Sequence, residues 1–77
     1  MSDLTIEPKA LSVLREDRGF DRARLAGALS LSARTIRGWE RRERRMGADD
    51  VSAAARALGL TDREELALSR WAGSVGE

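Results

Sequence analysis

The sequence contains no cysteine and no histidine. It therefore has no disulfide framework, no thiolate nucleophile and no imidazole base, and it lacks two residue types that commonly bind zinc. The acidic pairs that remain, such as Asp49 with Asp50 and Glu64 with Glu65, have no nucleophile or phosphate-binding loop beside them. We therefore expect that the protein is not an enzyme and that it uses no metal, no cofactor and no small-molecule substrate.

Long apolar runs and strand-forming residues are also scarce. The apolar stretches are short, and residues 1–10 lack the basic start and apolar stretch of a signal peptide. Because β-branched residues are few and every strong period is helical, we expect an all-α fold. The 77 residues form one small domain, residues 1–77, which we expect in the cytoplasm and not in a membrane.

Positive charge is concentrated in one segment. The whole chain carries a net charge of +1, but residues 34–45 hold six arginines against two glutamates, a local charge of +4. Residues 1–33 sum to zero and residues 46–77 to −3. A local cluster of arginines is typical of a nucleic-acid-binding surface. The alternative is a solvated face on which Glu43 pairs with its neighbours.

The first half of the chain predicts three helices. Pro8 suits a first helical position, and Gly19 suits a helix end, so the first helix is expected over residues 8–18. Asp21 can cap a second helix over Arg22–Leu29, and Ser32 can cap a third over residues 33–41. The junction between the second and third helices is too short for anything but a sharp corner.

The second half predicts two more helices. Met46-Gly47 breaks the pattern, and Asp49 or Asp50 can cap a helix that runs to Leu58. Thr61 and Glu64 have the spacing of a capping box, which predicts a fifth helix from about residue 62 to 71 or 72, with a frayed end beyond it.

Residues 11–60 resemble the Cro/repressor-type helix-turn-helix family, also called XRE-like. The residues that carry this resemblance are Leu14-Arg15, Gly19, Leu25-Ala26, Leu31-Ser32, Thr35-Ile36 and Trp39-Glu40-Arg41. The resemblance implies a five-helix, lambda-repressor-like domain with its helix-turn-helix unit at about residues 21–41. It also implies a partly buried ion pair between Arg15 and Glu40. Without the resemblance, two solvated surface charges would be an equal alternative.

Three positions depart from the pattern of that family. Ser30 stands at the corner where the family usually has glycine, which allows a different turn. Arg42 and Met46 stand where the family commonly has glycine and proline, which allows a longer third helix.

Gly38, inside the third helix, indicates either a close backbone approach or a merely tolerated exposed residue.

The outward face of the third helix is the candidate base-reading surface. With Ile36 and Trp39 turned inward, the residues expected to lie outward are Ala33, Arg34, Arg37 and Gly38. Arginine can bond the O6 and N7 atoms of guanine together, and an alanine methyl can contact the methyl of thymine. We therefore expect Arg34 and Arg37 to read G·C pairs.

Further residues are expected to bind DNA phosphates. By analogy with the family these are Arg22, Ser32 and Arg41, joined by Arg42, Arg44 and Arg45 on the flanking loop. Such contacts fix the register of the protein on the duplex without reading its sequence.

We therefore expect a sequence-specific, double-stranded DNA-binding transcriptional regulator, acting as a repressor and as a homodimer. Trp71 and Leu68 are candidate dimer contacts, and packing against the first helix is the alternative for Trp71. The alternative function is a protein-binding adaptor or antitoxin, since the acidic residues after position 46 suit a protein partner.

Overall fold

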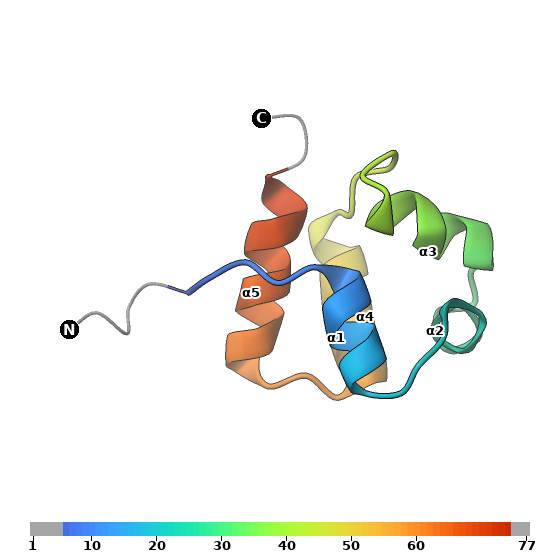
Figure 1. Ribbon diagram of the computed structural model, residues 1–77, viewed down its shortest axis with the longest axis horizontal. Helices are drawn as coiled ribbons and strands as arrows, with labels where there is room; N and C mark the ends of the chain where they lie inside the picture. The colour runs from blue at the N-terminus through green and yellow to red at the C-terminus, as the bar shows by residue number, and fades with distance from the viewer. Residues whose placement is uncertain (1–5, 75–77) are drawn as a thin grey trace.

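The computed structural model describes residues 6–74. Within that range the chain forms no strand and five helices, as predicted: α1 (Leu11–Asp17), α2 (Arg22–Leu29), α3 (Ala33–Glu40), α4 (Ala48–Leu58) and α5 (Asp62–Gly73). The pair α2 and α3 lies at one end of the molecule and α5 at the other, with α1 and α4 between them (Figure 1). The all-α, five-helix fold class is confirmed.

One hydrophobic core connects the five helices. Each helix contributes buried apolar side chains to it, namely Leu11, Leu14, Leu25, Ala26, Ile36, Trp39, Val51, Ala54, Leu58, Leu68 and Ala72. Met46, which the sequence analysis treated only as a break between helices, is also in this core and is 5% exposed. The unbranched methionine fills the core from a loop, a use to which its flexible side chain is well suited.

Local hydrogen bonds fix where α2, α3 and α5 begin. The carboxylate of Asp21 accepts the N–H of Arg24 at 2.7 Å, and the hydroxyl of Ser32 accepts the N–H of Thr35 at 3.2 Å. At the start of α5, Thr61 and Glu64 each accept the backbone N–H of the other. These caps occupy donors that have no partner inside the helix, and all three were predicted.

Both ends of α1 and the start of α4 differ from the predicted ones. The helix α1 begins at Leu11 because Ala10 has an extended backbone and the N–H of Lys9 donates to the carbonyl of Ala67 on α5 at 3.1 Å. The N-cap of α4 is Gly47, whose N–H donates to the carboxylate of Asp50 at 2.8 Å. The predicted Asp caps were therefore wrong, since both aspartates lie inside the first turn of the helix.

The chain was predicted to fray from Ala72 on, but Ala72 is packed; the part of that prediction that falls on residues 75–77 lies outside the described residues. Ala72 is 3% exposed and belongs to the core, and the helix continues to Gly73. Leu68 is completely buried, so its predicted role as a dimer contact is wrong. Trp71 is half-buried against the same core.

An ion pair that the sequence analysis did not predict fastens α5 to the end of α1. The guanidinium of Arg18 donates to the carboxylate of Glu64 at 2.5 Å and to the carbonyl of Leu58 at 3.2 Å. The N–H of Thr61, followed by the guanidinium of Arg18, lowers the pKa of Glu64 below its ordinary value of 4.5. The carboxylate of Glu64 is therefore held in its charged form in the folded protein.

This shift predicts a pH dependence of stability. Because the pKa is lower in the folded state than in the unfolded state, the stabilisation is complete above about pH 4.5 and is lost as the pH falls through the folded-state pKa. Glu64→Gln keeps the shape of the cap but cannot titrate, so its stability should fall less steeply in acid than that of the parent protein. Urea unfolding at a series of pH values measures this. The control Glu65→Gln, in the same helix, should retain the parent slope, and an equally steep fall for Glu64→Gln would contradict the assignment.

Candidate nucleic-acid interface

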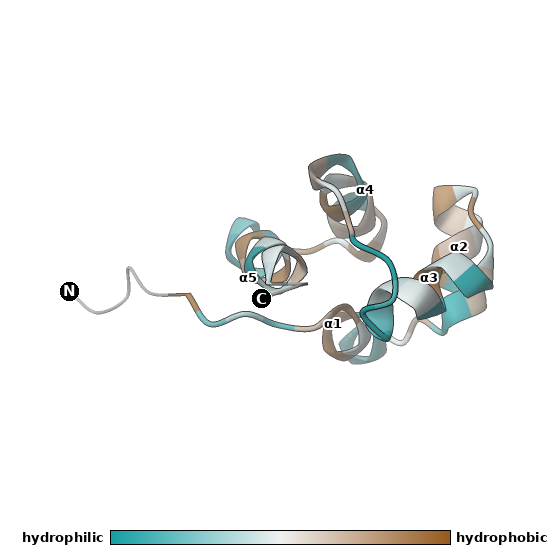
Figure 2. Ribbon diagram, turned by 90° about the horizontal axis from the view of Figure 1, so that it is seen from above, coloured by the Kyte–Doolittle hydropathy of each residue, from teal (hydrophilic) through white to brown (hydrophobic). Residues whose placement is uncertain are grey.

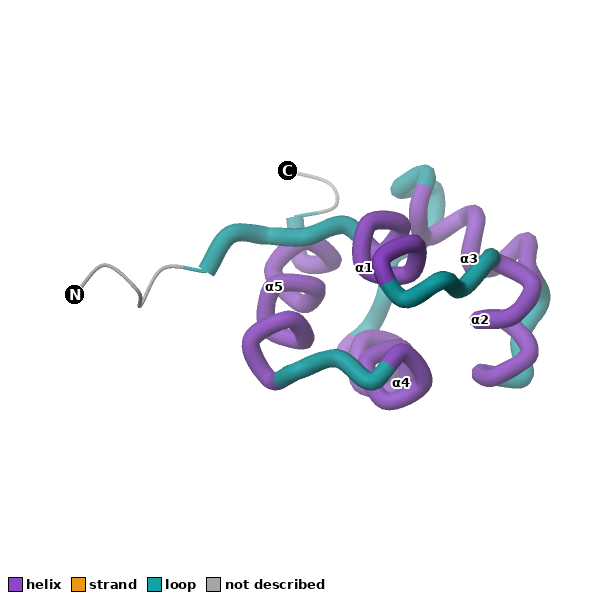
Figure 3. The backbone as a smooth tube through the Cα atoms, turned by 60° about the horizontal axis from the view of Figure 1, so that its bottom comes forward, coloured by secondary structure: helices purple, strands orange, loops and turns teal. Residues whose placement is uncertain are grey.

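The corner between α2 and α3 is formed by a left-handed residue and a backbone hydrogen bond. Ser30 takes the left-handed conformation, with φ of 58° and ψ of 39°, and the N–H of Leu31 donates to the carbonyl of Ala26 at 2.9 Å. A serine at positive φ costs roughly 1 kcal/mol relative to glycine. The sequence analysis allowed for a different turn at Ser30. Ser30 instead adopts the left-handed backbone conformation that glycine takes more easily. The paired helices lie away from α5 (Figure 3).

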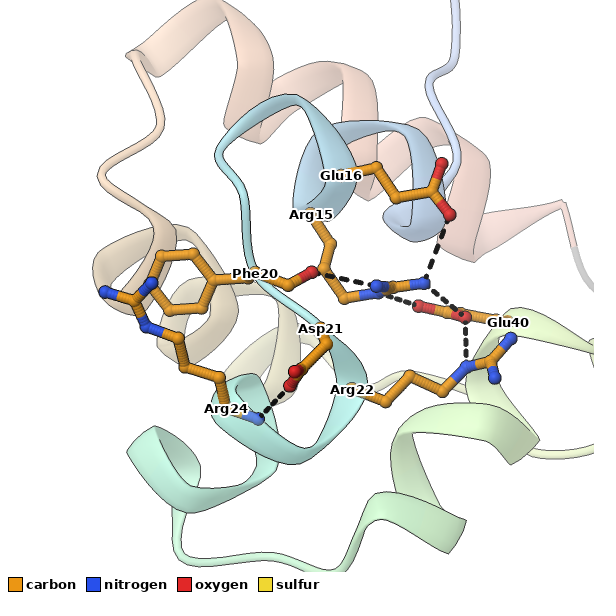
Figure 4. A network of polar contacts seen from close by, with 7 residues as sticks. All are labelled: Arg15, Glu16, Phe20, Asp21, Arg22, Arg24 and Glu40. Carbon is orange, nitrogen blue, oxygen red and sulfur yellow. Dashed lines mark hydrogen bonds and ion pairs between the residues drawn. The ribbon is translucent and has the colours of Figure 1, made fainter.

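The C-terminal end of α3 is anchored by a carboxylate shared between two arginines (Figure 4). Glu40 accepts from Nε of Arg15 at 2.7 Å and from Nε of Arg22 at 2.8 Å. Arg15 also donates to the carbonyl of Phe20 at 2.8 Å. The side chains of Arg15 and Glu40 are 7% and 4% exposed, so the predicted pair is present and is more deeply buried than expected. This network joins α1, α2 and α3 at one point.

Arg22 belongs to this network but remains accessible. Its side chain is 46% exposed. Only its Nε bonds Glu40, and its terminal nitrogens extend past the carboxylate (Figure 4). The bond to Glu40 therefore orients the guanidinium of a residue that was predicted to bind phosphate.

The outward face of α3 carries two arginines that the fold does not use. Ala33, Arg34 and Arg37 are exposed, and the side chain of neither arginine makes a hydrogen bond or ion pair within residues 6–74. Together with the start of α2 they line a groove of about 480 Å³ whose other lining residues are Asp21, Arg22 and Ala23. Three arginines thus line one groove between the start of α2 and the outward face of α3.

Gly38 does not lie on that face. It is buried, and its carbonyl accepts the N–H groups of Glu43 and Arg44 at 2.9 and 3.1 Å. A Cβ added to Gly38 would lie 2.9 Å from Cδ and 3.0 Å from Cγ of Arg44. The predicted base-reading role of Gly38 is therefore wrong. The close approach that its small size allows is made by the protein's own Arg44.

Arg44 lies along the flank of α3. Its terminal nitrogen donates to the hydroxyl of Thr35 at 3.3 Å, and that hydroxyl lies 3.1 Å from the hydroxyl of Ser32. The stem of Arg44 covers Gly38, so the guanidinium reaches the first half of α3 from outside the helix. Apart from the glycine itself, no pattern in the sequence indicated this arrangement.

The remaining arginines of the cluster differ in what they contact. Arg41, the C-cap of α3, has its Nε 3.3 Å from the carboxylate of Glu43, and both side chains are exposed. Arg45 is exposed and has no partner in the part of the chain that is described. Figure 2 shows that the end of α3 and the loop after it form a strongly hydrophilic stretch.

Arg42 points inward. Its guanidinium carbon lies 4.3 Å from the centre of the Trp71 ring, and the side chain donates to the carbonyl of Trp71. Its predicted phosphate contact is not supported in this conformation, because the side chain is turned toward α5 and one of its terminal nitrogens is bonded there. The longer third helix that Arg42 allowed is wrong, since α3 ends at Glu40. The sequence shows Arg42 where the family commonly has glycine, and a tryptophan later in the chain. These two residues do not by themselves predict that Arg42 contacts the ring of Trp71.

Two other kinds of feature are absent from the described residues. Residues 6–74 contain no group of three or more acidic, histidine or cysteine side chains placed to hold a metal ion. Within the same range, no helix combines the length and the apolar character needed to cross a bilayer.

The chain matches the model of a known protein family. A family model described as a helix-turn-helix domain matches residues 10–68, which is more than half of the chain and includes all of α1 to α4. A search among curated proteins and a search among solved structures found no match.

Proposed function

Because this chain belongs to the helix-turn-helix domain family, we propose that it is a sequence-specific, double-stranded DNA-binding regulator of transcription. The observation that carries the proposal is the pair Arg34 and Arg37, exposed on α3 and without a partner in residues 6–74. A helix held rigidly by its neighbours and bearing free guanidinium groups is what entry into a major groove requires. Such a protein acts in the compartment that holds the DNA.

Base reading is assigned to Ala33, Arg34 and Arg37. The two arginines are suited to guanine, because the planar guanidinium can donate to O6 and N7 at the same time, and Ala33 is suited to the methyl of thymine. The groove beside them, lined also by Arg22, lies between the start of α2 and the outward face of α3. We therefore expect G·C pairs in the recognised half-site.

Phosphate binding is assigned to Arg22, Ser32, Arg41, Arg44 and Arg45. Arg22 is supported by its exposed, pre-oriented guanidinium, and Arg45 by its exposure and lack of an internal partner in the described range. Ser32 uses its hydroxyl to cap α3, which leaves it beside the first N–H groups of that helix. The positive end of the helix dipole favours an anion at this place.

We further propose that the protein binds as a homodimer and represses transcription by covering its site. Small domains of this size often gain stability from a second copy, and two copies would bind half-sites about 34 Å apart. This dimer does not use Leu68, which is buried.

The direct test is binding to duplex DNA as a function of salt. If Arg22, Arg41, Arg44 and Arg45 each neutralise one phosphate, the logarithm of the binding constant should fall by roughly 3.6 per protomer for each tenfold increase in salt. Fluorescence anisotropy of labelled duplexes selected from a random pool measures both this slope and the sequence preference.

Failure of that test would favour a different function. A protein-binding adaptor or antitoxin would give no salt-dependent shift of duplex DNA. Binding that is salt-dependent but equal for every duplex would remove the base-reading assignment and leave only the phosphate contacts.

A further inference from the structure

The side chain of Arg42 joins the loop after α3 to the C-terminal end of α5. One terminal nitrogen donates to the carbonyl of Trp71 at 2.9 Å and to the hydroxyl of Ser74 at 2.6 Å. The guanidinium carbon lies 4.3 Å from the centre of the Trp71 ring, within the range of a cation–π contact. The loop and this end of α5 lie on the same side of the molecule, at the top of Figure 1. We call these contacts the Arg42 latch.

The backbone of Arg42 is in the left-handed region, with φ of 64°. Glycine adopts this conformation without a steric penalty, whereas an arginine does not. A glycine at position 42 would therefore suit the backbone better, but it could not make the contacts of the Arg42 latch. The Nε of Arg42 is buried and has no hydrogen-bond partner in residues 6–74, so the side chain lies in contact with α5 and is not extended into solvent.

The latch is one of three anchors of the loop. On the α3 side, the carbonyl of Gly38 accepts the N–H groups of Glu43 and Arg44. Near the start of α4, Met46 is inserted into the core. The latch attaches the loop to α5. The loop anchored in this way carries three arginines assigned to phosphate binding, namely Arg41, Arg44 and Arg45.

We propose that Arg42 is a positioning residue for DNA binding, which acts through its neighbours and not by contact with a phosphate. By holding the loop against α5, the latch sets where the guanidinium groups of Arg44 and Arg45 lie relative to the base-reading face of α3. This inference rests on the proposed function. It makes a residue of α5, Trp71, a determinant of affinity although it lies outside the interface.

The test compares Trp71→Leu, Trp71→Phe and Arg42→Gly in the full chain, with duplex affinity measured over a range of salt concentrations. Trp71→Leu changes no charge, and we expect it to weaken binding about three- to tenfold. The salt slope should become shallower by about 0.9 for each phosphate that the variant no longer neutralises. Trp71→Phe keeps an aromatic ring and should retain most of the affinity. Arg42→Gly also removes the bonds to the carbonyl of Trp71 and to the hydroxyl of Ser74, so it should weaken binding at least as much as Trp71→Leu. The double variant should be no weaker than Arg42→Gly alone.

The slope separates positioning from a purely structural role, because a folded but less stable protein still neutralises the same phosphates. Circular dichroism at the binding temperature establishes that each variant is folded, and Arg42→Gly suits the observed backbone. Trp71→Leu with the affinity and slope of the parent protein would overturn the latch and leave the proposed function intact. Tighter binding would also overturn it, because a released Arg42 would then be contacting phosphate. A parent protein without salt-dependent duplex binding would refute the proposed function itself.

Discussion

Replacing Glu40 with alanine should bring the domain close to unfolding. The change leaves Arg15, whose side chain is 7% exposed, as a buried cation whose remaining carboxylate is the exposed Glu16 at 3.5 Å. Removing one partner of a buried ion pair typically costs about 3–5 kcal/mol. A domain of this size is stabilised by only about 5 kcal/mol in total, so the loss is comparable to the whole stability. Thermal and urea unfolding followed by circular dichroism measure it.

Two control variants separate burial from charge. Glu43→Ala removes an exposed carboxylate that faces Arg41 and should cost less than about 1 kcal/mol. Arg15→Leu combined with Glu40→Leu replaces the buried pair by apolar side chains and should recover much of the stability lost in Glu40→Ala. If Glu40→Ala is no more harmful than Glu43→Ala, the shared carboxylate does not hold α3 as described.

Arg34→Ala should change which sequences are bound, whereas Arg45→Ala should change how tightly all sequences are bound. A bidentate contact to guanine contributes about 1–3 kcal/mol of discrimination, so Arg34→Ala should reduce the preference at one base pair roughly five- to 150-fold. Arg45→Ala should weaken binding to every duplex alike and make the salt slope shallower by about 0.9. Selection of bound duplexes from a random pool, repeated for each variant, measures the first effect.

Neither side chain makes a hydrogen bond or ion pair in residues 6–74, so its replacement removes no such contact from the fold. Equal unfolding midpoints for both variants and the parent protein are therefore expected and serve as the control. The reverse outcome, with Arg45→Ala altering the selected sequence and Arg34→Ala weakening all duplexes equally, would reject the assignment of the two roles.

Features set by neighbours in the sequence were predicted well. The bounds of α2 match the prediction, and the caps Asp21, Ser32 and Thr61 act on N–H groups three residues away. Such contacts are local, so the residue types and their spacing are sufficient to specify them. The pair Arg15 and Glu40 is not local, and only the family resemblance pointed to it.

Features set by contacts between distant segments were missed. The late start of α1 depends on a bond from Lys9 to α5, and the inward turn of Arg42 depends on Trp71. Gly38 was placed on the outward face by helical periodicity, but the loop after α3 folds back and covers it. Periodicity describes one helix at a time and contains no information about which later segment will return to it.

The residues that hold α3 are different from the residues proposed to read bases. Its attachment depends on Ile36, Trp39 and Glu40, whereas Arg34 and Arg37 have no internal partners among the described residues. Substitution at Arg34 or Arg37 should therefore change the free energy of unfolding little. Under the proposed function, new sequence preferences can accumulate by exchange of a few side chains on an unchanged support, while the carboxylate of Glu40 at the far end of the helix has no such freedom.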